Sequence, residues 1–215
     1  LLIAAAGYWA FGSPALPDSP RFQLPIAELR EEAWDYGNAD EVIVHVVSEG
    51  TMPGFVGTAW GGFGGDPRVY TAFEIRSGKK RLVVDAPHTE DLHSLVPGAG
   101  AYHPERFAAL EQAMADSSVI VLTHTHGDHV AGIPFGSAPD AVASKLFLNT
   151  AQHDLLEAMG MPEEPSIRTM GFPAELLAAT KRLSDKGWQW LAPVVELISA
   201  PGHTAGHQIV YVALP

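Results

Sequence analysis

Short apolar segments, rich in β-branched residues and bounded by Gly, Pro, Ser or charged residues, recur along the chain. Their length and their partial alternation of apolar with polar positions are typical of β-strands. The residues Ser-Gly-Lys-Lys at 77–80 predict a tight turn between two of them. The predicted strands span residues 41–47, 69–76, 81–86, 119–123, 144–150, 194–200 and 208–214.

Apolar residues at helical spacing mark further segments as amphipathic helices. Two of them, 25–34 and 103–117, carry Pro at or just inside their start, where a helix tolerates it. A third, 151–159, follows Thr150 as its capping residue, and a fourth, 173–187, ends at a glycine. Strands first, and then strands alternating with helices, predict an α/β sandwich whose helices lie outside the sheets.

A glycine-rich segment, 48–67, separates the first two predicted strands, yet it carries Met52, Phe55, Trp60 and Phe63. Two interpretations stay open. Apolar side chains on a mobile loop can form a lid or contact a lipophilic substrate. Alternatively, these side chains pack on the core.

The first 24 residues differ from the rest, because residues 1–11 are apolar and uncharged and a linker with Pro and Ser follows them. We expect the tail of a signal peptide or of an N-terminal membrane anchor here, with a buried strand or helix as the alternative. Export to the periplasm or membrane anchoring follows from the first interpretation, and a cytoplasmic location from the second. Residues 25–215 are predicted to form one domain.

Composition limits the chemistry. The formal net charge is −12, from 25 acidic and 13 basic residues, so the concentrated basic surface that nucleic acids require is not expected. The chain has no cysteine, which excludes disulfides, thiolate ligands and a cysteine nucleophile. It also lacks the Gly-x-Ser-x-Gly pattern that would offer a serine nucleophile.

Three of the ten histidines and an aspartate lie directly after the predicted strand 119–123. His124 and His126 are two positions apart, so in an extended chain they point to the same side and can both reach one metal ion. Asp128 and His129 lie on the following turn and face the same space. Neutral imidazoles with a carboxylate suit Zn²⁺, and they also suit iron or manganese.

Two other predicted strands end in residues of the same kind. Asp85 follows one, and we expect it to accept a hydrogen bond from a ligand imidazole and to fix its tautomer. His203 follows another and is a candidate ligand. For His207 we favour packing beside His203 over contact with substrate. The other histidines are expected not to bind metal: one in a strand core, His45, and surface residues His88, His93, His103 and His153.

The hexapeptide 124–129 resembles the H-x-H-x-D-H motif of the metallo-β-lactamase superfamily. A strand ending in Asp before it, and a strand followed by Pro-Gly-His-Thr at 201–204 after it, match that family's neighbouring motifs in the same order. The resemblance covers residues 42–214. It implies a metallo-β-lactamase-like αβ/βα sandwich with a metal site at the edge of its two sheets.

The resemblance also implies a ligand set. His124, His126 and His203 would hold one metal ion, and Asp128 and His129 would belong to a second, so that the complete domain binds two zinc ions. The family places a bridging Asp and a final His after the Pro-Gly-His-Thr strand. Because the sequence stops at Pro215, we expect a domain that lacks its last part.

The function implied is a hydrolase that uses metal-activated water on a small ester, lactone or amide, with Asp128 orienting the nucleophile and accepting its proton. One alternative is an iron oxidoreductase of the same fold, of the persulfide dioxygenase or flavodiiron type. Another is a non-catalytic, truncated relative. The sequence indicates a small-molecule substrate, and it does not indicate an oligomeric state.

Overall fold

The structure is a computed structural model that describes residues 24, 26–54, 62–161, 171–184, 188–192 and 194–215. Within these residues the chain forms a seven-stranded sheet in the order β4-β1-β2-β3-β5-β6-β7 and a three-stranded sheet in the order β10-β9-β8. The strands of the larger sheet are β1 Glu41–Pro53, β2 Gly65–Ser77, β3 Lys80–Val84, β4 Ala99–Tyr102, β5 Val119–Val121, β6 Leu146–Leu148 and β7 Lys181–Arg182. Those of the smaller sheet are β8 Trp188–Ala192, β9 Val195–Ser199 and β10 Gln208–Val212.

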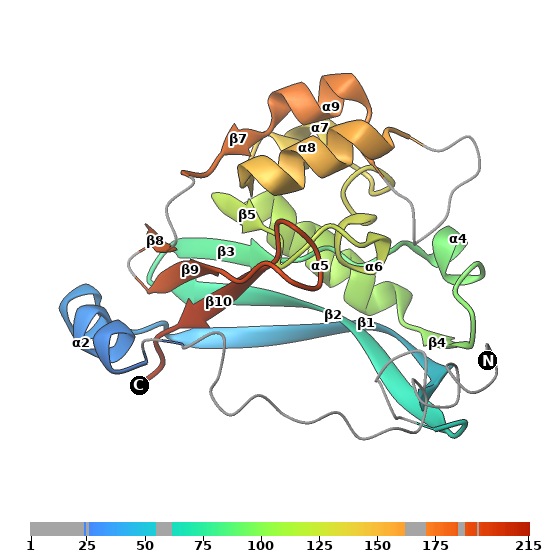
Figure 1. The fold of residues 1–215 in the computed structure, drawn as a ribbon, viewed down its shortest axis with the longest axis horizontal. Coiled ribbons are helices and arrows are strands. Elements are labelled where there is room, and N and C mark those ends of the chain that lie inside the picture. The colour runs from blue at the N-terminus through green and yellow to red at the C-terminus, as the bar shows by residue number, and fades with distance from the viewer. Residues whose placement is uncertain (1–23, 25, 55–61, 162–170, 185–187, 193) are drawn as a thin grey trace, which may run out of the picture.

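Most of the described helices lie on the face of the larger sheet that is turned away from the smaller one, whereas α2 lies beside the smaller sheet (Figure 1). Their apolar faces and that face of the sheet form one core cluster, which includes Leu110, Met114, Ile120 and Leu156. A second cluster, with Val121, Val195 and Leu197 among its members, fills the space between the sheets. The helices are α2 Ile26–Tyr36, α4 Glu90–His93, α5 Pro104–Asp116, α6 Gly127–Val130, α7 Pro139–Ala143, α8 Thr150–Met159 and α9 Ala174–Ala179. The predicted α/β sandwich is therefore confirmed.

The larger sheet changes from antiparallel to parallel strand pairing at β3. Strands β1, β2 and β3 pair antiparallel, and the tight turn between β2 and β3 has Gly78 at φ 58°, a conformation that glycine adopts without steric cost. From β3 through β5 and β6 to β7 the strands are parallel, and α5 and α8 are among the helices that connect them. Parallel strands end at the same edge of a sheet, so the residues that follow β3 and β5, which include the candidate site, lie together at that edge.

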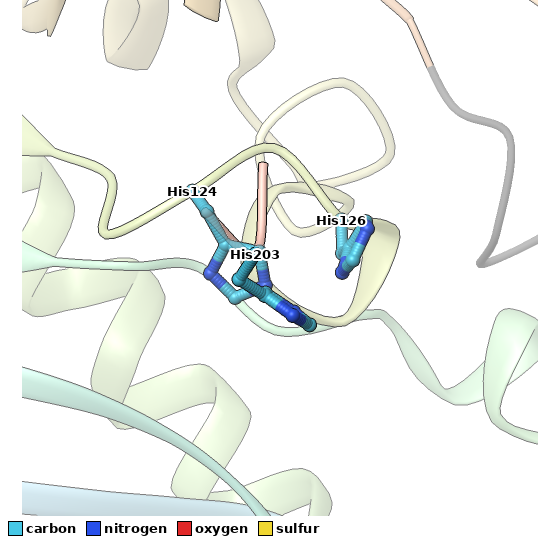
Figure 2. A group of neighbouring side chains, drawn as sticks. All are labelled: His124, His126 and His203. Carbon is cyan, nitrogen blue, oxygen red and sulfur yellow. The ribbon is translucent and has the colours of Figure 1, made fainter. Parts of the chain in front are cut away.

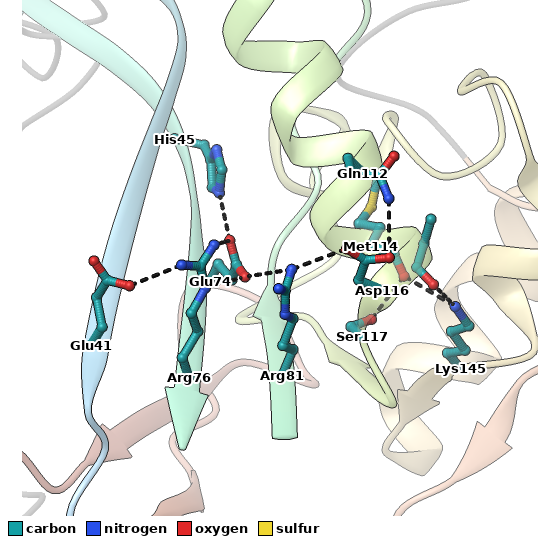
Figure 3. A network of polar contacts seen from close by, with 11 residues as sticks. Glu41, His45, Glu74, Arg76, Arg81, Gln112, Met114, Asp116, Ser117 and Lys145 are labelled. Carbon is teal, nitrogen blue, oxygen red and sulfur yellow. Dashed lines mark hydrogen bonds and ion pairs between the residues drawn. The ribbon is translucent and has the colours of Figure 1, made fainter. Parts of the chain in front are cut away.

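Glu74 on β2 is a buried carboxylate, only 2% exposed, and it pairs in register with Val83 on β3. It pairs with Arg76 at 2.7 Å and with Arg81 and His45 at 3.6 Å each (Figure 3). Arg81 also forms an ion pair with Asp116, the last residue of α5, at 3.0 Å. Two arginines offset the cost of burying the charge, and the network joins β1, β2, β3 and α5. His45 is the core histidine that the sequence predicted.

The glycine-rich segment 48–67 is not simply a loop. β1 continues through Pro53 and β2 begins at Gly65, so both strands are longer than predicted and pair along much of this segment. Inter-strand hydrogen bonds outweigh the low strand propensity of its glycines. Met52 is half-buried and Phe63 is 75% exposed, whereas Phe55 and Trp60 lie outside the described residues.

The predicted helix 173–187 is wrong for residues 180–184, and its last three residues lie outside the described part of the chain. The side chain of Thr180 donates to the carbonyl of Leu177 over 2.8 Å, a local bond that competes with continuation of the helix. Lys181 and Arg182 then pair with β6 as the edge strand β7. The cap of α8 is Asn149 rather than Thr150, since the Asn149 side chain accepts from the backbone N–H of Gln152.

Residues 1–23 lie outside the described part of the chain, so the signal-peptide or anchor segment at 1–24 remains a prediction. Of the helices that are described, none combines the length and the apolar character needed to cross a membrane. The elements that the sequence did not predict are mostly short: β4, β7, β8, α4, α6 and α7.

Candidate metal centre

The candidate site lies at the edge of the larger sheet where β3 and β5 end side by side. The backbone N–H of Asp85 donates to the carbonyl of Val121 over 2.9 Å, which extends the contact between the two strands past their ends. The chain then leaves β5 and enters α6 at Gly127. Residues 124–129 are therefore held beside Asp85.

His203 reaches the same place from the smaller sheet. The backbone N–H of Gln208, the first residue of β10, donates to the carbonyl of Thr123 over 2.9 Å. The ring of His203 consequently lies 4.7 Å from that of His124 and 4.6 Å from that of His126, centroid to centroid (Figure 2). The rings of His124 and His126 are 4.8 Å apart. The structure thus brings together three histidines that the sequence places on two distant strand ends.

These three imidazoles fit a metal ion. Their ligand nitrogens lie within 4.8 Å of one another. Two ligands on one tetrahedral ion are about 3.4 Å apart when each bond is about 2.0–2.1 Å, so modest side-chain rotation closes the difference. His124 is buried, His126 is half-buried and His203 is exposed. Three protein ligands with one open side are the arrangement of a catalytic zinc site.

Asp128 and His129 form a second group with His124, in which the ligand atoms again lie within 4.8 Å of one another. The rings of His124 and His129 are 4.0 Å apart, and Nε2 of His129 lies 3.8 Å from Oδ2 of Asp128. By distance, His124 is within reach of both groups, whereas the sequence assigned it to the first alone. One ring nitrogen binds one ion, so His124 can serve only one of the two sites at a time.

Asp85 orients His129. Its Oδ2 accepts from Nδ1 of His129 and from Oγ1 of Thr123, both at 2.8 Å, and its Oδ1 accepts from the backbone N–H of Thr123 at 2.7 Å. Asp85 is 2% exposed and has φ 64°, a left-handed conformation that Asp tolerates better than most residues. Because Nδ1 of His129 donates to Asp85, its Nε2 is the nitrogen left for a metal.

Thr123 belongs to the site, although the sequence reasoning missed it. Its hydroxyl donates to Asp85 and lies 3.1 Å from Nδ1 of His124. The hydroxyl has one hydrogen, so its oxygen accepts from Nδ1 of His124 and leaves Nε2 of that ring for a metal. The available signal was a hydroxyl residue directly before the first histidine of the motif.

The surroundings favour the neutral form of His124 and of His126. Burial, followed by the neighbouring histidines, lowers the pKa of His124 to about 2. Burial, followed by His203, also lowers the pKa of His126. Burial opposes the charged form of His129, but its hydrogen bond to Asp85 and the charges of Asp85 and Asp128 raise its pKa on balance. A neutral imidazole keeps the lone pair that a metal needs.

His207 lies at the rim of the cluster, with its ring 5.6 Å from that of His124 and 6.0 Å from that of His203. Its Nδ1 donates to the carbonyl of Ala200 over 3.0 Å, which closes the base of the loop that carries His203. The bond leaves Nε2 as the acceptor of this ring. Both roles considered for His207, substrate contact and packing beside His203, are compatible with this placement.

The prediction that His88 and His93 are surface residues is wrong, since they are 0% and 7% exposed. Nε2 of His93 donates to the carbonyl of Gly100 at 3.0 Å, so its Nδ1 accepts from Nε2 of His88 at 3.1 Å. Oγ of Ser48 lies 3.2 Å from the same nitrogen of His88. The helix α4 and the strand β4, neither of which the sequence predicted, enclose the pair.

The two other histidines that the sequence placed on the surface are partly exposed. His103 is 27% exposed and pairs with Glu49 at 3.1 Å. His153 on α8 is 14% exposed and lies close to the exposed carboxylates of Asp154 and Glu157. Neither histidine is in contact with the cluster around His124 in the described residues.

Several solved structures share the fold of this chain. A quorum-quenching N-acyl homoserine lactone lactonase aligns with a TM-score of 0.60 and 14% identity, over 82% of this chain and 69% of its own. An N-acyl homoserine lactone hydrolase, with the product N-hexanoyl-L-homoserine bound at its catalytic metal center, aligns with a TM-score of 0.59 and 14% identity. The alignment covers 82% of this chain and 71% of that one. A Staphylococcus aureus protein described as a probable metal-dependent hydrolase aligns with a TM-score of 0.61 and 14% identity, over 83% of this chain and 70% of its own.

The chain has the metallo-β-lactamase fold. This confirms the fold that the three sequence motifs implied. No protein-family model matches the chain, and no curated protein sequence matches it. At 14% identity the likeness establishes the fold, so the activity is argued from the chemistry of the site.

Proposed function

We propose that this chain is part of a metal-dependent hydrolase that uses activated water on a small ester, lactone or amide. One observation carries the proposal: His124, His126 and His203 leave two different sheets and meet with their ligand nitrogens within 4.8 Å of one another. The ring of His124 is buried, so leaving its second nitrogen without a partner is costly, and a metal ion shared with His126 and His203 would satisfy it. The structural neighbours described as lactonases support the same class of reaction.

In the proposed mechanism, His124, His126 and His203 would hold one ion, and Asp128 with His129 would contribute to a second. A zinc ion held there would supply Lewis acidity, the property that makes water nucleophilic at neutral pH. Asp128 is about one-third exposed on the open side, where its carboxylate can orient a water molecule and accept its proton.

Thr123 and Asp85 play supporting roles in this proposal. They hold the Nδ1 hydrogens of His124 and His129, so the Nε2 lone pairs face the ion. The donor set of imidazoles and carboxylates favours zinc, with iron or manganese as the other metals that such ligands accept.

The substrate class rests on two features. The neighbours act on N-acyl homoserine lactones, which are small molecules with a carbonyl centre. The net charge of −12 disfavours a nucleic-acid substrate. We therefore propose a small carbonyl compound, and we place the chain outside the nuclease branch of its fold.

Metal analysis of the purified protein tests the proposal most directly. We expect wild type and His153→Ala to retain the same amount of divalent metal, while His126→Ala loses about one equivalent because a three-imidazole site does not survive with two. An aryl ester, a γ-lactone and an amide serve as probes of hydrolysis. Unchanged metal content in His126→Ala contradicts the ligand assignment. Bound iron with oxygen consumption, and no hydrolysis, favours the oxidoreductase alternative.

A further inference from the structure

The loop that carries His203 is secured by side chains from outside both of the motifs that supply the histidines. It runs from the end of β9 at Ser199 to the start of β10 at Gln208. Its own backbone bonds join Ala200 to His207 and, near the tip, Gly202 and His207 to Thr204. These bonds shape the loop, but they do not set its distance from the chain that carries His124 and His126.

The backbone bond from Gln208 to Thr123 joins the loop to that chain at one point. Three amide side chains, Asn149, Gln152 and Gln208, add further connections, and we call them the amide clamp. Gln152 is fully buried, and its Nε2 donates to two carbonyls at 3.0 Å each, those of Leu122 and Gly206. Leu122 lies two residues before His124, and Gly206 lies three residues after His203. A single amide nitrogen therefore spans the two chain segments whose histidines meet.

The other members reinforce both ends of the bridge. Nε2 of Gln208 donates to the carbonyl of Leu122 at 2.7 Å. Nδ2 of Asn149 donates to the carbonyl of Gly206 at 3.0 Å and to Oε1 of Gln208 at 3.4 Å. Each of the two bridged carbonyls thus accepts from two amides, as the two lone pairs of a carbonyl oxygen allow.

The orientation of Gln152 is fixed by the start of α8. Asn149 and Gln152 form a capping box, in which Oε1 of Gln152 accepts from the backbone N–H of Asn149 at 3.3 Å. With the oxygen used there, the nitrogen of Gln152 must face Leu122 and Gly206. A Cβ on Gly206 would lie 2.6 Å from Cγ of Gln152 and 2.9 Å from Oδ1 of Asn149, so only glycine permits this approach.

We propose that Gln152, supported by Asn149 and Gln208, is a positioning residue of the metal centre. Together with the backbone bond from Gln208 to Thr123, it sets the separation between His203 and the pair His124 and His126, and so contributes to how tightly the three imidazoles hold an ion. The inference rests on the proposed function. It assigns a task to residues that touch neither the ion nor the substrate.

Cobalt binding tests this assignment without relying on catalysis. Co²⁺ is titrated into metal-free protein well below the melting temperature, and the visible absorption bands report affinity and coordination geometry. Gln152→Met keeps the size of the side chain and removes both donors. We expect Co²⁺ affinity to fall about tenfold, at the lower end of what residues supporting metal ligands contribute, with altered bands.

Two further variants separate positioning from simple loss of stability. Leu156→Ala removes a fully buried side chain one turn further along the same helix. It should lower the melting temperature at least as much as Gln152→Met, yet leave the Co²⁺ affinity and bands of the folded protein unchanged. Asn149→Ser keeps a good capping residue but removes the donor to Gly206, so it folds and should weaken Co²⁺ binding about threefold.

The outcomes distinguish this inference from the proposed function. If wild type binds no Co²⁺, or if His203→Ala binds it as wild type does, the metal centre itself is wrong and the inference fails with it. If His203→Ala loses binding while Gln152→Met and Asn149→Ser bind as wild type does, only the positioning role is overturned. If Leu156→Ala weakens binding as much as Gln152→Met, the effect is one of general stability and the role is likewise overturned.

Discussion

Two groups of histidines, the candidate metal centre and the pair His88 and His93, differ in how many of their ring nitrogens form hydrogen bonds within the protein. In the candidate metal centre no hydrogen bond joins the rings of His124, His126 and His203 to one another in the described residues, and their ligand nitrogens face a common space. In the pair His88 and His93, three of the four ring nitrogens are already bonded within the protein. The first group has lone pairs left for an ion, whereas the second uses its nitrogens in contacts with Ser48 on β1 and Gly100 on β4.

The pKa values alone would not separate the two groups. Burial is the largest cause that lowers the pKa of His124, to about 2, and also that of His88, to about 4. In both groups a second histidine lowers it further. What distinguishes the groups is whether several lone pairs converge on one point, which is a matter of geometry and not of protonation.

The largest effect is expected from removing a ligand. His126→Ala should lower Zn²⁺ affinity by at least a hundredfold, because one of three imidazoles is lost. His93→Ala, in the other group, should leave that affinity unchanged. Chelator competition on both variants measures the difference. Equal losses in the two variants would erase the distinction drawn between the groups.

The second effect concerns stability, and here the pair His88 and His93 should matter more than the metal centre. His88→Ala removes a fully buried ring together with its hydrogen bonds, and we expect it to cost about 2–4 kcal/mol of unfolding free energy. Metal stoichiometry should remain that of wild type. Urea unfolding of the metal-free protein provides the measurement. A loss below about 1 kcal/mol would show that the contacts of this pair with Ser48 and Gly100 do not stabilise the fold.

The pH dependence of stability sharpens the comparison further. The folded pKa of His88, about 4, lies below its unfolded value of 6.5, so the unfolded chain binds more protons between those values. Stability of the metal-free protein should therefore fall as pH decreases from about 6.5 to about 4. His88→Asn should reduce that slope by about one proton, or about 1.4 kcal/mol per pH unit. An unchanged slope would mean that His88 is not buried in its neutral form.

The smallest effect is expected at His103, which is 27% exposed and pairs with the exposed side chain of Glu49. Solvent and salt screen such a pair, so His103→Ala should change the unfolding free energy by less than about 1 kcal/mol. It should not alter metal affinity. Thermal melts at low and high salt check this, and a larger, salt-independent loss would place His103 with the buried histidines.

Much of the site could be read from local sequence. The alternation of His124 and His126 after an apolar strand predicts that both point the same way, and Asp85 and His203 each follow a strand in the same manner. Local spacing did not reveal Thr123 as a partner of Asp85, nor the burial of His88. Both depend on contacts over about forty positions, which no periodicity encodes.

The fold shows the same division. Strong apolar segments such as β5 and α5 were predicted within a few residues, because burial of an apolar stripe dominates their free energy. The helix expected over 173–187 failed because pairing of Lys181 and Arg182 with β6, with Thr180 ending α9, outweighed helical propensity.

The sequence by itself therefore determined which side chains could bind a metal and which strands carry them, since residue type and period are local properties. Only the tertiary structure decided that His203 meets His124 and His126, because two sheets must first pack and be joined at Leu122 and Gly206 through Gln152. Convergence of distant residues is a property of packing, and packing depends on the whole chain at once.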